Sequence, residues 1–127
     1  MSVALTFVAP PPGLAPLTDF SLDPVDGAHG LYALVAEADP ALRLYVVDAG
    51  VYLPDYAPVI TDEHADALGL ATADDAMVLV VATPAATGTT VNLMAPIVVN
   101  SSTGRSAQVI LDGQDWPLRE SLGARAA

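Results

Sequence analysis

Residues 91–111 read VNLMAPIVVN, then SSTGR, then SAQVIL, and this stretch is expected to form the central hairpin of a β domain. Two apolar runs rich in β-branched residues flank a polar segment, a pattern that predicts an antiparallel hairpin because such side chains pack well on a pleated sheet. Gly104 allows the turn to reach positive φ. Pro96 has no N–H to donate, so its strand must be bulged there or paired on one side only. Residues 106–111 alternate, which predicts one core face and one mixed face.

Other apolar runs predict the rest of the sheet. Residues 76–83 are apolar without alternation, which is typical of a central strand covered on both faces. Leu31–Ala36 and Leu42–Val47 are joined by an acidic turn with a proline and predict a second hairpin. Shorter strands are expected at Leu5–Val8 and Phe20–Leu22.

One helix is expected, of about two turns. Thr61 or Asp62 can cap its first N–H groups, and Gly69 can end it in the left-handed conformation. Residues 115–122 are expected to add a last helical turn. The chain is therefore predicted to be one all-β, mainly antiparallel domain over residues 1–127, a small barrel with one short helix.

The composition excludes several classes of function. The chain has 127 residues, no cysteine, and 15 acidic residues against four arginines and no lysine, a net charge of −11. So few cations argue against direct binding to nucleic acid. The charge would steer a basic protein partner toward the chain, or it serves only solubility. No signal peptide, membrane span, metal motif or cofactor motif is recognised, so we expect a cytoplasmic protein without metal or cofactor.

Several motifs resemble the flagellar assembly factor FliW family. That family has an Asn-Leu-x-Ala-Pro run followed by three hydrophobic residues and Asn, matched here by residues 92–100. Pro54-Asp55-Tyr56 and the order from Glu37 to Asp48 also match, and the resemblance covers about residues 5–122. The chain departs at residues 15–17, which read Ala-Pro-Leu where Pro-Gly-Phe is usual. It also lacks the strand that usually precedes this point, so an uncovered sheet edge or an upstream start is expected.

The resemblance implies a monomeric protein-binding regulator. FliW-like proteins bind newly made flagellin, and they also bind CsrA, a dimeric translational repressor that holds flagellin messenger RNA. Flagellin that accumulates occupies the regulator and frees the repressor, whereas export of flagellin returns the regulator to the repressor. The circuit would match flagellin synthesis to export, with no membrane and no direct nucleic-acid contact.

Two sets of residues are the site candidates. The partner contacts are predicted from charge and loop placement alone, and solvated loop acids remain an equal alternative. They are Asp39, Asp48, Asp55, Tyr56, Asp74 and Asp75. The family-motif residues are expected to be structural, with both asparagines satisfying backbone groups at a bulge or turn. These residues are Pro54, Asn92, Leu93, Ala95, Pro96 and Asn100.

Two other classes of function stay open. A small acidic enzyme would use Asp48 and Asp55 near Tyr56, one carboxyl as acid and the other as base, although no enzyme motif is recognised. A β-edge assembly module would instead use an exposed strand and form oligomers.

Overall fold

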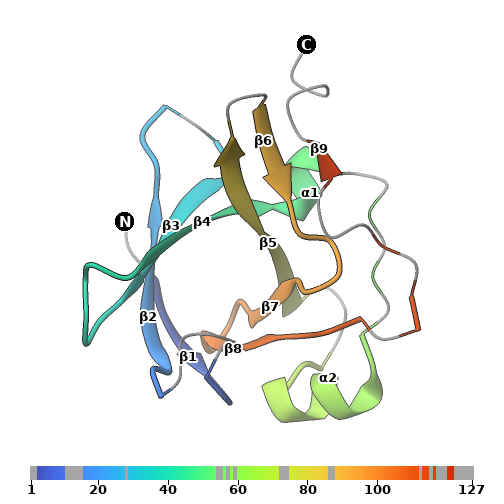
Figure 1. Cartoon of the computed structure of the whole chain (residues 1–127). Helices are drawn as coiled ribbons and strands as arrows, with labels where there is room; N and C mark the ends of the chain where they lie inside the picture. The colour runs from blue at the N-terminus through green and yellow to red at the C-terminus, as the bar shows by residue number, and fades with distance from the viewer. Residues whose placement is uncertain are drawn as a thin grey trace.

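Seven strands close into a barrel in the computed structural model (Figure 1). The structure describes residues 3–10, 16–27, 29–53, 56, 58, 60–71, 75–85, 88–111, 113–114, 116 and 120–121. The strands are β1 (Val3–Phe7), β2 (Asp19–Pro24), β3 (Leu31–Ala36), β4 (Arg43–Asp48), β5 (Ala76–Ala85), β6 (Gly88–Val91), β7 (Ile97–Asn100), β8 (Arg105–Gln108) and β9 (Glu120–Ser121). The helices are α1 (Ala49–Tyr52) and α2 (Asp62–Leu68). The predicted fold class is confirmed.

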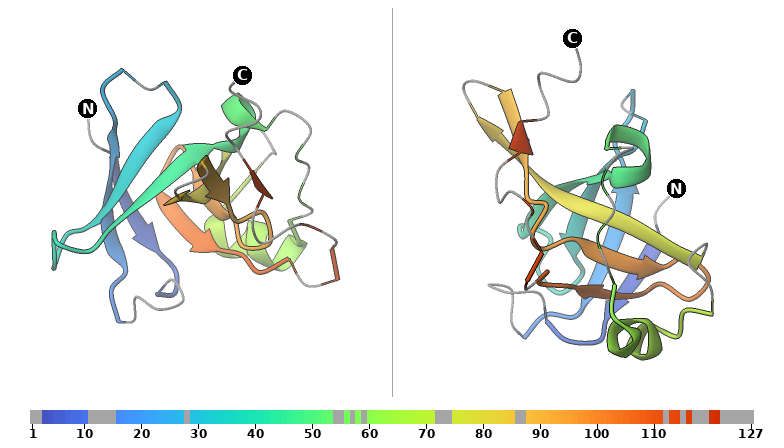
Figure 2. Two further views of the ribbon diagram at one scale, coloured as in Figure 1. Left: turned by 45° about the horizontal axis from the view of Figure 1, so that its top comes forward. Right: turned by 90° about the vertical axis from the view of Figure 1, so that its right-hand side faces the viewer.

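The ring runs β4-β3-β2-β1-β8-β7-β5, and the pairing of β5 with β4 closes it. Its neighbours are antiparallel except β1 and β8, which pair in parallel through Thr6 with Arg105 and Phe7 with Ser106. β6 and β9 extend the sheet beyond the ring along the second half of β5 (Figure 2). Since β1 pairs with β2 on one side and β8 on the other, the expected uncovered edge at the first strand is not found there.

The predicted hairpin is present as β7 and β8. Gly104 has a φ of 80° in the turn, and a Cβ built there would lie 2.4 Å from the Ala4 carbonyl oxygen. That approach brings the Gly104 carbonyl to Thr6, whose N–H donates to it at 3.0 Å. Glycine is therefore required both for the turn and for closing the barrel between β1 and β8.

The strand that carries Pro96 is interrupted, as its missing N–H predicted. β6 ends at Val91 opposite Ala82, and β7 begins at Ile97 opposite Leu79. Five residues, 92–96, thus lie opposite only two residues of β5. The loop that they form is a large bulge in the sheet.

β5 is covered on both faces at Leu79 and Val80, as its unbroken apolar run predicted, whereas residues 76–78 are only half-buried. Leu79 belongs to the barrel interior, whereas Val80 packs in a second cluster outside the barrel. Both are fully buried. The interior is filled by one or two side chains from most strands, namely Leu5, Phe7, Phe20, Leu22, Leu34, Ala36, Val46, Leu79, Ile97 and Val99.

α2 has the predicted ends. The Thr61 hydroxyl accepts a hydrogen bond from the His64 N–H, and Gly69 ends the helix with a φ of 70°. Leu68 of this helix packs on Val98, Val109 and Leu111, so α2 covers a third cluster outside the barrel. The alternating face of residues 107–111 is thus buried, but beneath α2 rather than inside the barrel.

Three features differ from the expectations. α1 was not predicted, because four residues are too few to show a helical period. The expected helical turn near the end is wrong at Glu120–Ser121, which form β9 against β6. Ser106, on the mixed face of its strand, is fully buried and its hydroxyl donates to the Gly104 carbonyl at 3.0 Å.

In the described part of the chain, no helix is long and apolar enough to cross a membrane.

Candidate functional site

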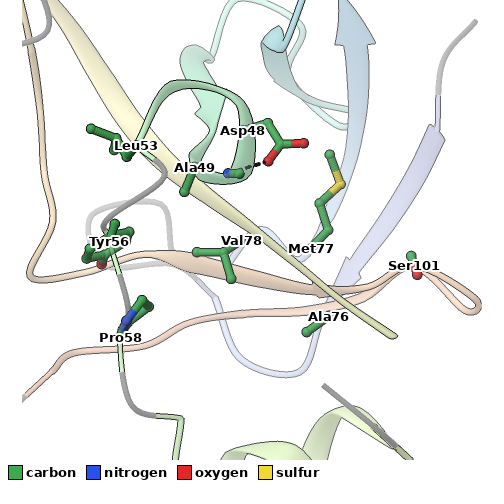
Figure 3. Close-up of a pocket in the computed structure, with 10 residues that line it drawn as sticks. Asp48, Ala49, Leu53, Tyr56, Pro58, Ala76, Met77, Val78 and Ser101 are labelled. Atoms are coloured by element: carbon green, nitrogen blue, oxygen red, sulfur yellow. Dashed lines mark hydrogen bonds between the residues drawn. The ribbon is translucent and has the colours of Figure 1, made fainter. Parts of the chain in front are cut away.

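A groove of about 610 Å³ runs between α1 and the first residues of β5 (Figure 3). α1 and its N-cap form one wall, the start of β5 and the turn after β7 form the other, and Leu53, Tyr56 and Pro58 lie at one end. The lining residues are Asp48, Ala49, Gly50, Leu53, Tyr56, Pro58, Ala76, Met77, Val78 and Ser101.

The α1 wall exists because Asp48 ends β4 and caps the helix. Its Oδ1 accepts a hydrogen bond from the Gly50 N–H at 2.9 Å, which satisfies one of the first free donors of the helix. The Leu53 N–H donates to the Ala49 carbonyl at 2.8 Å and ends this single turn. Leu53 is buried in the same outer cluster as Val80. The chain therefore leaves the sheet at Asp48 and remains anchored beside it.

The β5 wall is half-buried and apolar. β5 pairs with β4 only as far as Leu79 opposite Asp48, so residues 76–78 extend past the end of β4. Met77 packs against the barrel interior and Val78 against the outer cluster, each with part of its surface in the groove. An apolar side chain entering here would bury surface on both walls.

Tyr56 lies at one end of the groove and is held by two contacts. Its hydroxyl donates to the Leu93 carbonyl oxygen. Its ring meets Trp116 edge to face, with centroids 4.8 Å apart and planes at 84°. Burial raises the pKa of Tyr56 well above its usual range, so the phenol stays protonated and keeps donating.

A second groove of about 660 Å³ continues from the first toward α2. The two share Pro58, Ala76 and Val78, so they run along the same part of β5. The new lining residues come from α2 and its flanks and are Ile60, Asp62, Ala65, Asp66, Leu70 and Ala71. Together the grooves form a channel with Asp48 at the α1 end and two acids of α2 at the other.

The charges of the channel have one sign. Asp48, Asp62 and Asp66 line it, and no Arg or Lys is among the lining residues that the structure describes. Asp62 and Asp66 are exposed and Asp48 is half-buried, so their attraction for a cationic group is modest and weakens as salt rises. The channel therefore favours a ligand that is apolar in the middle and cationic at its ends.

The motif residues 92–96 form a loop in which the carbonyl groups of residues 93–96 all accept hydrogen bonds. The Leu93 carbonyl accepts from the Tyr56 hydroxyl, and the Met94 carbonyl accepts from the Leu111 N–H at 2.8 Å. The carbonyls of Ala95 and Pro96 accept from Gln108 Nε2 at 3.1 Å and the Val109 N–H at 2.9 Å. The side chains of Leu93 and Ala95 are buried. These contacts hold the bulge closed.

Both motif asparagines satisfy backbone groups, as the sequence predicted. Asn92 Oδ1 accepts from the Met94 N–H at 3.0 Å and so forms a turn. Asn100 is 3% exposed, and its Nδ2 donates to the Leu68 and Gly69 carbonyls at 2.8 and 3.3 Å. Its Oδ1 accepts from the Ser102 N–H at 2.9 Å. One buried amide thus ties the end of α2 to the end of β7.

The structure brings some of the predicted contact residues together. Asp48 and Tyr56 line the same groove. Asp75 adjoins it, because its carbonyl accepts from the N–H and the hydroxyl of Ser101, at 2.9 and 3.0 Å. Asp39 lies in the turn between β3 and β4. That turn projects at the left of Figure 1, across the barrel from α1. Asp55, Asp74 and Pro54 lie outside the described residues.

Sequence reasoning missed the apolar part of the site. Ala76, Met77 and Val78 were read as part of a covered strand, and Trp116 was not paired with Tyr56. The signal in the sequence was the length of the apolar run over residues 76–83. This run is longer than Leu42–Val47, so part of it would have no partner if the two pair as antiparallel strands. Asp62 lies in the first turn of α2, where an acid favours the helix dipole, and that role alone gives no sign of a groove.

Catalytic or metal chemistry finds no support in the described residues. No group of three His, Asp or Glu side chains that could hold a metal ion is found among them. The carboxylate of Asp48 caps α1, and the second member of the predicted acid pair, Asp55, lies outside them. What the arrangement offers is an apolar channel with acidic ends, which suits binding.

Comparison with known proteins gives a family and named relatives. The family model described as "FliW protein" matches residues 2–122. The flagellar assembly factor FliW of Thermotoga neapolitana is 32% identical over 114 residues, covering 87% of this chain and 76% of that protein. The protein of the same name from Desulfitobacterium hafniense strain Y51 is 37% identical over 93 residues, covering 72% of this chain and 60% of that protein.

A solved structure agrees with the sequence relatives. The crystal structure of the flagellar assembly factor FliW has a TM-score of 0.87 to this chain at 26% identity, covering 94% of this chain and 84% of that one. The family model spans nearly all of the sequence, and the fold matches. The chain belongs to the FliW family.

Proposed function

We propose that this chain is a flagellar assembly factor that binds flagellin and antagonises the translational repressor CsrA, so that flagellin translation is coupled to export. The observation that carries the proposal is the family match over residues 2–122. The relatives are named as flagellar assembly factors, not as enzymes. A binding role is also consistent with an apolar channel that has acidic ends.

The charge of the chain supports the repressor part of the proposal. An RNA-binding repressor presents basic surface, and a chain of net charge −11 would attract it over a distance. The regulator can cover the RNA surface of the repressor, or it can bind outside it and hold the repressor in a poorly binding state while repelling RNA. The family resemblance favours the second route.

The proposed contact surface centres on the groove between α1 and β5. Asp48 and Tyr56 line that groove, and Asp75 adjoins it. Asp55 and Asp74 stay in the proposal from the sequence alone. Asp39 belongs to a separate part of the surface, so it would contact a partner only if the partner reaches around the barrel. We further propose that the chain works in the cytoplasm as a monomer.

Calorimetric titration tests the proposal. The chain is titrated with flagellin and with CsrA from the same genome at low and high salt, and the two partners are then made to compete. We expect mutually exclusive binding, with the CsrA interaction weaker at high salt because charged contacts are screened. Absence of binding to both partners would contradict the proposed function.

Charge reversal tests the contact surface separately. Reversing Asp48 and Asp75 should weaken CsrA binding and flatten its salt dependence, and reversing Asp39 serves as the matched control. An unchanged affinity in the first variant would move the contact surface elsewhere and leave the proposed partners untouched.

A further inference from the structure

The edge of β5 that faces the α1 groove is open over residues 76–78. β4 pairs with β5 from Tyr45 opposite Ala82 to Asp48 opposite Leu79, and the chain then turns into α1. In the part of the chain that the structure describes, no strand pairs with this side of β5 before Leu79. An open strand edge presents N–H and C=O groups that a further strand can meet.

The direction of these groups follows from hydrogen bonds on the opposite side. The Asp75 carbonyl accepts from the Ser101 N–H, and the Val81 carbonyl accepts from the Asn92 N–H at 3.0 Å, both on the side of β6 and β7. The bonding groups of successive residues in a strand point to opposite neighbours. The backbone N–H and C=O groups of the odd-numbered residues of β5 therefore point to β6 and β7. Those of Ala76 and Val78 point to the groove.

The channel has room for an extended segment along this edge. The two grooves share Ala76 and Val78 and have volumes of about 610 and 660 Å³. A strand rises roughly 3.3 Å per residue, so the three-residue edge spans about 10 Å. Figure 3 shows α1 on one side of this part of β5, with Leu53, Tyr56 and Pro58 at one end of the groove.

Charge selects the kind of segment. Asp48 lies at the α1 end of the channel, and Asp62 and Asp66 lie at the α2 end. The walls between them are apolar. A segment that matches this pattern has apolar residues at alternate positions and an Arg or Lys at its ends.

We propose that the Ala76–Val78 edge binds an extended, arginine- or lysine-flanked segment of a protein partner by β-strand addition. The backbone of the segment pairs with Ala76 and Val78, its apolar side chains fill the channel, and its cationic ends lie against the aspartates. Backbone pairing supplies affinity and the side-chain pockets supply selectivity. The inference rests on the proposed function, in that the natural occupant would come from one of the proposed protein partners.

Amide hydrogen exchange measured by NMR tests the edge directly. The probes are the heptapeptide Arg-Val-Thr-Val-Thr-Val-Arg, whole flagellin and whole CsrA. At a probe concentration ten times its Kd, exchange at Ala76 and Val78 should slow about tenfold. Met77 and Leu79 are internal controls, because they already bond to β7 and should exchange at the same slow rate with and without probe.

The outcomes separate the edge from the proposed function. Protection of Ala76 and Val78 alone supports strand addition, even if only the peptide produces it and neither protein binds. Binding of flagellin or CsrA without protection, together with no protection by the peptide, overturns strand addition and leaves the proposed function intact. Equal protection at all four positions also overturns it, because general stabilisation would then explain the result.

A charge variant provides a second test. Asp48→Asn removes the charge and keeps an N-cap side chain, so the chain should fold as before. The Kd of the peptide should rise about threefold at low salt. Asp39→Asn makes the same charge change in the exposed β3–β4 turn and should leave that Kd unchanged; equal effects of the two variants would contradict the placement of the cationic end.

Discussion

The sheet is interrupted on both sides of β5, and the two interruptions differ. On one side the strand breaks between β6 and β7, and residues 92–96 fill the break. The four carbonyls from Leu93 to Pro96 all accept hydrogen bonds within the protein. On the other side β4 ends at Asp48, and a groove remains beside β5.

The difference shows what the family motif encodes. Buried polar groups must be bonded, so a break inside the sheet needs side chains and backbone groups that satisfy it. The Asn-Leu-x-Ala-Pro run and its closing Asn supply part of that set here. The Asn-Leu-x-Ala-Pro motif therefore marks the closed side of β5, where it maintains the barrel. The open side is lined by Asp48 and Tyr56, which belong to the other two family motifs, and by residues 76–78, which belong to none.

The largest expected effect is on the closed side, at Asn100. Asn100→Ala should lower the free energy of unfolding by about 2–3 kcal/mol, because two carbonyls at the end of α2 and one N–H lose a buried partner. Urea unfolding measures the change. Asn92→Ala, which removes one bond in a half-buried turn, is the control and should cost about 1 kcal/mol. Equal losses would mean that the α2 connection adds nothing.

A smaller effect is expected at Tyr56, which lines the groove on the open side of β5 and bonds to the Leu93 carbonyl on the closed side. Tyr56→Phe removes the donor to the Leu93 carbonyl and keeps the ring against Trp116, so stability should fall by about 1 kcal/mol. Thermal unfolding at neutral pH measures it. If Tyr56→Phe is as stable as the parent chain, water bonds to the Leu93 carbonyl in the variant. Solvent then reaches the loop on the closed side of β5.

On the open side, Asp48 should matter to stability only as a cap. Asp48→Ala should cost about 0.5–1 kcal/mol, whereas Asp48→Asn should cost almost nothing, because Asn caps a helix about as well as Asp. Urea unfolding of the two variants makes the comparison. A cost for Asp48→Asn similar to that for Asp48→Ala would show that the charge itself holds α1, which would weaken the case for a binding role.

The smallest effect appears only at high pH. Burial raises the pKa of Tyr56 above the unfolded value of about 10. The free energy of unfolding therefore keeps its full value below pH 10 and falls as pH rises above it. The reason is that the unfolded chain then releases a proton that the folded chain keeps. Unfolding measured at several pH values between 8 and 11 should show a shallower alkaline fall in Tyr56→Phe than in the parent chain. Identical slopes would contradict the burial of the phenol.

Local features of the fold could be predicted from the sequence because nearby residues determine them. Leu31–Ala36 was identified with its observed ends, the α2 helix lies between the predicted cap Thr61 and the predicted stop Gly69, and Gly104 makes the expected turn. Each depends on a period or on one residue with special backbone freedom. The number of strand-like runs predicted a small barrel, but the order of the strands around the ring depends on contacts between distant residues and is contained in no local pattern.

The site could be predicted only in part, because its geometry joins distant residues. Nothing in the sequence near Asp48 shows that β4 stops three residues short of the start of β5, since that depends on the register between two strands. Tyr56 and Trp116 meet only after the chain has folded around the outer cluster. Asp39 shares the charge of Asp48 but lies in a different turn, and charge alone could not separate them.

Closure of the barrel by β1 and β8 has a consequence for biosynthesis. Thr6 pairs with Arg105, so the two strands that complete the ring are separated by 105 − 6 = 99 positions in the chain. The entropy lost in closing so long a loop must be offset by contacts already formed. A ribosome must therefore translate past residue 105 before the ring can close, and until then β1 and β2 emerge as a hairpin with one side exposed to chaperones and to other nascent chains.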